Sequence, residues 1–319
     1  MRVPDPTERR TIRETGVAVS ALGVGTAGIG GMYTAVGEDE ALATVRHALD
    51  AGLSYLDTAP HYAQGLVEER LGRALAGVPR DAYVLSTKVG RILTETDVPP
   101  ETIFADVPAR ETSWDFSADG VRRSLDASLE RLGLDRVDIV YLHDPDDHVE
   151  QALTEAYPAL EKLRAEGVVR AIGVGMNQSA VPTRFVTETD IDLVLLAGRW
   201  TVLDQSGLAD LLPAAYERGR AIVIGGVFNS GLLADPRPGA PFDYAPAPEA
   251  LVARASVLRA ACERHGVALT TAALHFPYRH PAVVSVLSGA RSVAETDANL
   301  AALRTPVPDA LWDEVAVLR

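Results

Sequence analysis

The chain has a single cysteine and no long hydrophobic run. Cys262 alone can form neither an internal disulfide nor a thiolate metal site, as is typical of proteins of the reducing cytosol, and we expect it to pack within a helix. No apolar run approaches the ~18 residues that a membrane-spanning helix needs, and residues 1–10 lack the apolar core of a signal peptide. We therefore expect a cytoplasmic protein without a membrane partner.

Basic residues are also scarce. Thirty lysines and arginines stand against 44 aspartates and glutamates, which gives a formal net charge of -14. Such an acidic surface repels phosphate backbones and anionic membranes, so we expect no nucleic-acid partner. The hydrophobic share of 47% and the charged share of 23% exclude disorder and coiled coil. The length of 319 residues fits two medium domains or one large α/β barrel.

Short runs rich in β-branched residues alternate with amphipathic stretches along the whole chain. The runs predict eight strands, at Leu22–Gly25, Leu53–Asp57, Tyr83–Lys88, Val137–Leu142, Val168–Gly173, Ile191–Ala197, Ala221–Gly225 and Val283–Leu287. The stretches predict helices at 38–51, 64–77, 118–132, 150–166, 179–188, 205–218, 249–265 and 294–304. Parallel strands must be covered by helices, and eight repeats favour a closed α/β fold, the (β/α)8 TIM barrel, over an open sheet.

The segments outside these repeats complete the expected architecture. Residues 11–19 read as a small N-terminal hairpin that caps the bottom of the barrel. The segments 90–117 and 226–248 are long and rich in proline and aspartate, which indicates functional loops over the carboxyl-terminal face. Because no linker-like stretch divides the chain, we expect residues 1–319 to form a single domain.

Two tempting motifs do not carry the chemistry that they suggest. Gly23–Gly28 matches G-x-G-x-x-G after a strand, but the helix that a dinucleotide-binding turn requires begins only near Glu38. Asp144–His148 gathers carboxylates and an imidazole, yet acidic residues before a helix are more often caps and dipole partners. No second cluster with ligand spacing supports a metal, so we expect no metal site.

Polar residues follow three consecutive strands at the points where these strands end. Asp57 ends the second strand, Lys88 ends the third, and His143 follows the fourth. The carboxyl ends of barrel strands meet at one face, where barrel enzymes carry their active sites. Taken singly, these residues could be a helix cap, a surface lysine and a loop histidine. Together with Tyr62, five residues after Asp57, they indicate a catalytic group.

The four residues suit proton transfer coupled to hydride transfer. An ordinary tyrosine is too weak a base at neutral pH, and a nearby ammonium such as Lys88 would lower the pKa of Tyr62. Asp57 would hold Lys88 charged and in position, while His143 would hydrogen-bond the substrate oxygen. The set has neither a nucleophile–base pair nor metal ligands, so hydrolysis fits less well.

At these motifs the sequence resembles the aldo-keto reductase superfamily, over essentially the whole chain. Leu56–Gly72 is similar to the family signature around its catalytic Asp and Tyr, Ser86–Val89 to its lysine motif and Asp138–His143 to its histidine motif. The resemblance implies the catalytic tetrad Asp57, Tyr62, Lys88 and His143 and a nicotinamide cofactor extended over the barrel mouth. It also implies Asn177 at the cofactor carboxamide and an adenosine-binding segment that contains Gly289, Arg291, Glu295 and Asn299.

Three local features resemble the sugar-oxidising, aldose 1-dehydrogenase branch of this family. They are Trp114–Gly120, His143–Asp146 and Leu196–Asp204. The resemblance implies oxidation of the anomeric hydroxyl of a free aldose, of the L-fucose or D-threo-aldose type, to a lactone. Pyridoxal 4-dehydrogenase is similar to the same branch, so oxidation of the pyridoxal hemiacetal is an alternative. A general reductase of small carbonyls and a non-enzymatic regulatory barrel are further alternatives.

The same resemblance suggests contacts for the substrate and a preferred cofactor. Trp114 could stack on a sugar ring or pack within its loop, and Arg199 could contact hydroxyls or the cofactor or form a structural ion pair. Gly289 and Glu295 fall where family members that prefer NADPH carry basic residues. A carboxylate repels a 2′-phosphate but accepts a hydrogen bond from a free 2′-hydroxyl, with Arg291 as the counterweight. We therefore expect NAD to be preferred over NADP.

Overall fold

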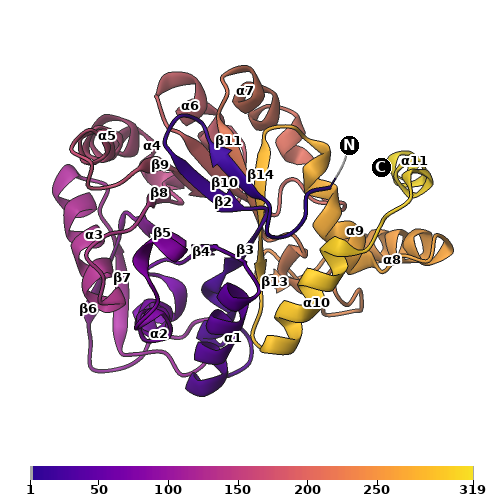
Figure 1. Cartoon of the computed structure of the whole chain (residues 1–319), viewed down its shortest axis with the longest axis horizontal. Helices are drawn as coiled ribbons and strands as arrows, with labels where there is room; N and C mark the ends of the chain where they lie inside the picture. Colours follow the sequence, from indigo (N-terminus) through magenta and orange to yellow (C-terminus); the bar gives the residue numbers. More distant parts are fainter. Residues whose placement is uncertain (1–2, 319) are drawn as a thin grey trace.

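The apolar runs form eight parallel strands that close into a barrel (Figure 1). The computed structural model describes residues 3–318. Around the barrel the strands follow the order β10, β11, β14, β3, β4, β5, β8, β9. Their bounds are β3 Leu22–Gly25, β4 Tyr55–Asp57, β5 Val84–Val89, β8 Ile139–His143, β9 Ala171–Met176, β10 Leu193–Ala197, β11 Ala221–Gly225 and β14 Val283–Gly289. The predicted (β/α)8 fold is confirmed.

Helices cover the outside of the barrel, close to the predicted ranges. They are α1 Glu38–Asp50, α2 Leu66–Leu75, α3 Ala118–Leu132, α5 Tyr157–Ala165, α6 Ala180–Glu188, α7 Leu211–Glu217, α8 Glu249–Arg264 and α10 Val293–Arg304. In α3 the Ser117 hydroxyl accepts a hydrogen bond from the Gly120 N–H, and Gly133 ends the helix at a φ of 63°. Its apolar stripe, with Val121 and Leu125, is buried against the barrel. Cys262 is buried within α8, as expected.

Some helices differ from the sequence expectation. The predicted helix 150–166 is divided into α4 (Val149–Gln151), a π-helical turn at Ala152–Ala156 and α5. The helix expected from residue 205 begins only at Leu211. Two further helices, α9 (Leu269–His275) and α11 (Asp309–Val317), were not predicted. Both are short, and a helix of two turns carries too few apolar repeats to stand out in a sequence.

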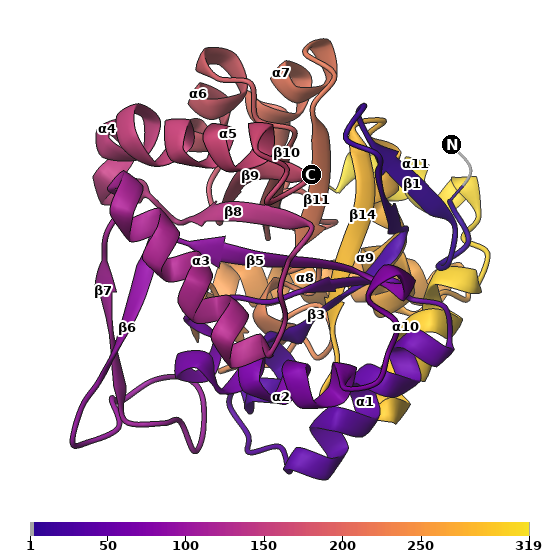
Figure 2. The same ribbon diagram turned by 60° about the vertical axis from the view of Figure 1, so that its left-hand side comes forward.

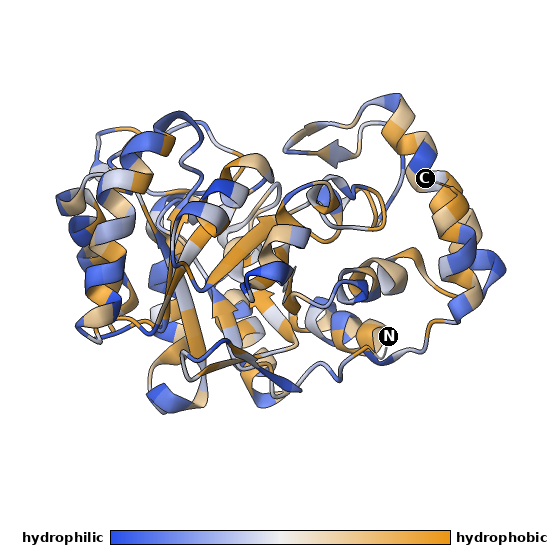
Figure 3. Cartoon of the chain, turned by 90° about the horizontal axis from the view of Figure 1, so that it is seen from above, coloured by the Kyte–Doolittle hydropathy of each residue, from blue (hydrophilic) through white to orange (hydrophobic). Residues whose placement is uncertain are grey.

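The predicted amino-terminal hairpin closes the bottom of the barrel. Strands β1 (Arg9–Ile12) and β2 (Val17–Ser20) pair antiparallel. Their side chains Ile12, Val17 and Val19 are fully buried and pack among the inward-facing residues of the barrel strands. Figure 3 shows the barrel strands as largely hydrophobic, inside a shell of helices that carry both polar and apolar positions.

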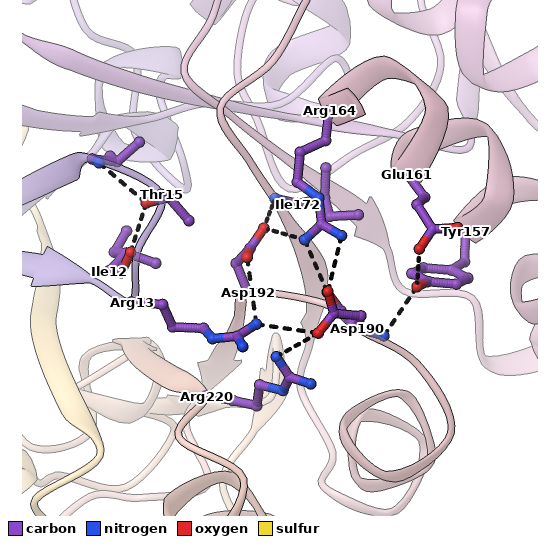
Figure 4. Close-up of polar contacts among 11 residues, drawn as sticks. Ile12, Arg13, Thr15, Tyr157, Glu161, Arg164, Ile172, Asp190, Asp192 and Arg220 are labelled. Carbon is purple, nitrogen blue, oxygen red and sulfur yellow. Dashed lines mark hydrogen bonds and ion pairs between the residues drawn. The ribbon is translucent and has the colours of Figure 1, made fainter. Parts of the chain in front are cut away.

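Ion pairs tie the strand starts together at the same end of the molecule (Figure 4). Asp192, just before β10, accepts hydrogen bonds from the Ile172 N–H at 3.0 Å and from Arg164 at 2.8 Å. Arg13, in the turn of the hairpin, lies 3.6 Å from the same carboxylate. A neighbouring carboxylate, Asp190, also pairs with Arg13, Arg164 and Arg220. The bottom of the barrel is therefore fixed by structural contacts.

The two long segments extend over the other end and contain strands of their own. In 90–117, β6 (Arg91–Glu95) pairs antiparallel with β7 (Arg110–Trp114), and the hairpin projects beside α3 (Figure 2). In 226–248, β12 (Pro241–Phe242) pairs with β13 (Ala245–Pro246). Neither pair was predicted. The stretch between β6 and β7 contains three prolines, and β12 and β13 are only two residues long and each include a proline, so neither shows an alternating pattern. Among residues 3–318, no helix is long and apolar enough to cross a membrane.

Candidate active site at the barrel mouth

Neighbouring strands deliver the predicted polar residues to one end of the barrel. In the parallel register, Asp57 at the end of β4 lies opposite Ser86 of β5, and His143 at the end of β8 lies opposite Gly175 of β9. Tyr62 opens a 3-10 turn after β4, in which Ala63 and Gln64 adopt left-handed φ angles of 48° and 52°. This tight, buried turn directs the Tyr62 ring back toward the strand ends.

The Lys88 ammonium joins Asp57 to Tyr62. Its Nζ atom donates hydrogen bonds to Asp57 Oδ2 at 2.7 Å, to the Thr58 carbonyl at 3.0 Å and to Tyr62 Oη at 3.0 Å. The lysine is only 2% exposed. Since an ammonium has three donors and all three are used, the charge of Lys88 is held at a fixed place beside the Tyr62 hydroxyl.

A second layer of hydroxyls below Asp57 was not predicted from the sequence. The Ser86 hydroxyl donates to Asp57 Oδ1 at 2.6 Å, and it lies 3.2 Å from the Tyr55 hydroxyl, which in turn lies 3.0 Å from that of Tyr141. All of these groups are buried inside the barrel. Both oxygens of Asp57 are therefore fixed. The sequence signal that could have revealed these hydroxyls is a polar residue at an inward-facing position of each otherwise apolar strand: Tyr55 in β4, Ser86 in β5 and Tyr141 in β8.

The pKa of Tyr62 beside Lys88 differs from the sequence expectation. Burial alone would lower the pKa of Lys88, but attraction to Asp57 and Tyr62 outweighs it and holds that pKa above its ordinary value. Burial is the largest influence on Tyr62 and raises its pKa, while Lys88 lowers it and Asp57 raises it. Lys88 acts in the predicted direction, yet the net pKa of Tyr62 lies above its ordinary value because desolvation of the phenolate outweighs the ammonium.

His143 is a neutral imidazole beside Tyr62. The two ring centroids lie 6.1 Å apart with the planes at 88°. Burial, together with the nearby charges of Arg91 and Lys88, lowers the pKa of His143 well below its usual value. Nδ1 is buried without a hydrogen-bond partner, whereas Nε2 lies 3.6 Å from Asp144 Oδ2. The tautomer with the proton on Nε2 is favoured, since it leaves no buried N–H unpaired at Nδ1.

Arg91 and Asp144 stand next to this histidine and were not predicted as site residues. Arg91 opens β6 just after the Lys88 strand, and its Nη2 donates to Asp144 Oδ2 at 2.6 Å. The side-chain cap expected from the acidic loop 144–148 is not made in either following helical segment, although Asp146 and Asp147 do stand in the first turn of the 3-10 helix Asp146–His148. Asp144 pairs with the buried guanidinium instead. Within the described residues, no group of three or more His, Cys, Asp or Glu could hold a metal ion.

The two predicted substrate residues are engaged with protein side chains. The Arg91 guanidinium lies over the Trp114 ring at 4.1 Å, and the ring stacks with that of Phe116 at 6.1 Å. Arg199, after β10, forms a bidentate ion pair with Asp243 at 3.0 and 2.6 Å. Trp114 remains 44% exposed, so these contacts leave its predicted role at the substrate open, and the Arg199–Asp243 pair ties loop 226–248 to the barrel.

The residues assigned to a cofactor lie beyond the ends of β9 and β14. Asn177 directly follows β9, and Asn299 on α10 donates to the Gly289 carbonyl at 3.4 Å. A side chain at Gly289 would meet nothing closer than the Gly25 carbonyl at 3.8 Å, and the neighbouring Ser288 hydroxyl is buried without a partner. The open backbone at Gly289 and the unpaired hydroxyl of Ser288 suit hydrogen bonds to a ligand that carries amide and hydroxyl groups.

Arg291 and Glu295 form a salt bridge to each other rather than pointing apart. The guanidinium of Arg291 meets the Glu295 carboxylate at 2.8 and 3.2 Å, and the Arg291 N–H donates to the same carboxylate at 2.8 Å. This bond and the nearby charge lower the pKa of Glu295 against the opposing effect of burial, so it is ionised at neutral pH. The positive charge of Arg291 is therefore already neutralised.

A parallel barrel whose mouth holds a lysine-bound tyrosine beside a neutral histidine is built for acid–base chemistry at a carbon–oxygen bond. Comparison with known proteins agrees. The model of the Aldo/keto reductase family matches residues 21–318, and the chain belongs to this family of oxidoreductases. It is 44% identical to D-threo-aldose 1-dehydrogenase of a Pseudomonas species, over 95% of both chains.

Two further proteins extend the comparison. The chain is 40% identical to pyridoxal 4-dehydrogenase of Microbacterium luteolum, over 96% of this chain and 95% of that protein. Among solved structures, an aldo-keto reductase from Bacillus halodurans in its holo form superimposes with a TM-score of 0.78 at 27% identity. That match covers 98% of this chain and 96% of the other.

Proposed function

We propose that this oxidoreductase oxidises the anomeric hydroxyl of a free aldose to the aldonolactone, with a nicotinamide cofactor. The observation that carries the proposal is the phenol of Tyr62 held 3.0 Å from a buried, charged lysine and beside a neutral histidine. The 44% identity to D-threo-aldose 1-dehydrogenase supports an aldose as the substrate. We propose that Asp57, Tyr62, Lys88 and His143 are the catalytic residues.

The proton of the sugar hydroxyl goes to Tyr62. In the phenolate form Tyr62 is the base, and the Lys88 ammonium stabilises its negative charge. His143, with its proton on Nε2, donates a hydrogen bond to the reacting oxygen and orients it toward Tyr62. Because burial raises the pKa of Tyr62 above its ordinary value, the phenolate fraction and hence the oxidation rate rise with pH across the alkaline range.

A nicotinamide cofactor bound at the barrel mouth would supply the acceptor for the hydride of the oxidised carbon. Asn177 is proposed to hold the carboxamide, and Gly289, Arg291, Glu295 and Asn299 the adenosine end. The neutralised charge of Arg291 supports NAD over NADP, because a 2′-phosphate would lie beside an ionised carboxylate. We expect at least about a tenfold higher kcat/KM with NAD⁺, from ~1.4 kcal/mol of repulsion.

The second candidate function is oxidation of pyridoxal to its lactone by the same four residues. The 40% identity to pyridoxal 4-dehydrogenase favours it specifically. Its hemiacetal hydroxyl is chemically equivalent to the anomeric hydroxyl of a sugar, so the proton transfer is identical.

The acidic composition and the single cysteine support a cytoplasmic location, and we propose that residues 1–319 act as one barrel domain.

A screen of NAD⁺ reduction tests the proposal. The purified protein is assayed at alkaline pH with L-fucose, D-arabinose, L-galactose, L-xylose, D-glucose and pyridoxal, and the product is identified as a lactone. Turnover of one or more aldoses supports the proposal. Turnover of pyridoxal alone would establish the second candidate, and reduction of small carbonyls without any oxidation of these six compounds would make the protein a general reductase.

A further inference from the structure

The Arg91–Asp144 pair is a charged contact at the barrel mouth that the proposed chemistry does not use. Both residues follow barrel strands: Arg91 comes three positions after Lys88 of β5, and Asp144 comes directly after His143 of β8. The side chain of Arg91 is 10% exposed and that of Asp144 is 27% exposed. Burial raises the pKa of Asp144 while Arg91 lowers it, so the guanidinium supports the charged carboxylate.

The pair is incompletely satisfied. Arg91 Nε is buried and has no hydrogen-bond partner, and only Nη2 of the guanidinium reaches the carboxylate. Asp144 also has a φ of 45°, in the left-handed region that non-glycine residues seldom occupy. A buried polar pair with an unused donor lowers stability relative to an apolar packing. Backbone strain and unsatisfied polar groups occur together where a protein binds a ligand.

The position of Asp144 identifies what the ligand must carry. Its Oδ2 lies 3.6 Å from His143 Nε2, the atom that donates to the reacting oxygen. A ligand that contacts both His143 Nε2 and Asp144 Oδ2 must carry, besides the reacting oxygen, a second hydroxyl about one hydrogen-bond length away from it. The two oxygens of a vicinal diol meet this condition, whereas a simple aldehyde or alcohol does not.

We infer that Arg91 and Asp144 form the subsite for the hydroxyl on the carbon next to the anomeric carbon, the C2 hydroxyl of an aldose. The inference rests on the proposed aldose oxidation and deepens it. Asp144 accepts the hydrogen of this hydroxyl, and Arg91 donates to its oxygen. Charge-assisted hydrogen bonds of this kind are short and strongly directional, which suits the reading of one stereocentre.

Trp114 supports the subsite as a positioning residue. Its ring lies 4.1 Å from the Arg91 guanidinium, and Arg91 pairs with Trp114 across the β6–β7 hairpin. A guanidinium stacked on an indole face keeps its plane, so its donors point in a fixed direction. The β6–β7 hairpin thereby contributes both the donor and its support.

The test compares two sugars that differ only in the hydroxyl in question. D-arabinose carries a C2 hydroxyl, and 2-deoxy-D-erythro-pentose is the same pentose without it. We expect the wild-type protein to have a kcat/KM about ten- to hundredfold higher for D-arabinose, the range of a hydrogen bond to a charged group. Arg91→Met and Asp144→Asn each bring this ratio close to one, because kcat/KM falls for D-arabinose and changes little for the deoxy sugar.

Two variants control for folding. Arg136→Met removes an exposed arginine before the start of β8, where it pairs with Asp81 and Asp135 at the opposite end of the barrel, and it should keep the wild-type ratio. The double variant Arg91→Met/Asp144→Asn removes both charges of the buried pair and should show the low ratio without an unpaired charge. Thermal unfolding of each variant shows that it is folded.

The outcomes separate this inference from the proposed function. Oxidation of D-arabinose with a ratio that stays at the wild-type value in Arg91→Met, Asp144→Asn and the double variant overturns the C2 subsite and leaves aldose oxidation intact. A wild-type protein that oxidises both sugars equally well also overturns it. A wild-type protein that oxidises no aldose overturns the proposed function, and the inference with it.

Discussion

Replacing Lys88 with methionine removes the charge that stabilises the Tyr62 phenolate and keeps most of the side-chain volume. The ammonium lies 3.0 Å from Tyr62 Oη, and Asp57 lies on its other side at 2.7 Å. At an effective dielectric constant of about 20, unit charges at this distance attract by about 5 kcal/mol, which corresponds to about four pKa units. Relaxation around the site reduces this value, so we expect the pKa of Tyr62 to rise by at least about two units.

The direction in which the pH profile of Lys88→Met moves follows from the role of the phenolate as the base. The wild-type pKa of Tyr62 is already raised by burial, and the loss of Lys88 leaves Asp57 to raise it further. Oxidation requires the unprotonated form, so the rising alkaline limb of log kcat/KM moves to higher pH, and activity at a fixed pH below this limb falls about a hundredfold or more.

The assay is oxidation of the best aldose with saturating NAD⁺, from about pH 7 to about pH 11. Lys162→Met is the matched control, because the exposed side chain of Lys162 is held only by a 3.9 Å contact to Glu166. Asp57→Asn/Lys88→Met removes both buried charges and guards against a single variant that does not fold. Residual activity of Lys88→Met with an unmoved pH profile would refute the coupling between Lys88 and Tyr62.

Three further predictions concern the Tyr62 hydroxyl itself, the Arg291–Glu295 salt bridge and the ion pairs at the bottom of the barrel. Tyr62→Phe loses the proton acceptor and should lower kcat by ~10²-fold or more while cofactor binding, followed by fluorescence titration, stays nearly unchanged; a variant that keeps a tenth of the activity contradicts this role. Glu295→Gln releases the charge of Arg291 and should raise kcat/KM with NADP⁺ by about tenfold, while kcat/KM with NAD⁺ falls because the carboxylate that accepts the 2′-hydroxyl hydrogen bond is lost; an unchanged NADP⁺ value would show that Arg291 does not reach the phosphate. Asp192→Ala leaves the Ile172 N–H unpaired and should lower the free energy of unfolding by about 1–3 kcal/mol, measured with urea, without changing kcat/KM.

The architecture could be predicted because its signals are local. Each barrel strand is a short β-branched run, and each major helix repeats its apolar positions along one face, as Val121 and Leu125 do in α3. The strand-end residues Asp57 and Lys88 could be assigned to one site from the sequence, since parallel strands deliver their carboxyl ends to the same face of a barrel. Their contact at 2.7 Å follows from that placement.

The pairings between loops could not be predicted from the sequence, because they depend on long-range geometry. Arg91 and Asp144 are 53 positions apart and meet only once β5 and β8 have paired in the barrel. Arg199 likewise meets Asp243 across 44 positions. Nothing local in either loop distinguishes these charged residues from those on a solvated surface.

The sequence by itself determined the barrel and the four groups gathered at its mouth; the tertiary structure decided how strongly each group is perturbed and which neighbours it has. Tyr62 shows the difference most clearly. The nearby lysine could be inferred from spacing, and it acts in the expected direction, but burial raises the pKa of the phenol by more. Desolvation depends on every atom that covers a group, and those atoms come from segments throughout the chain.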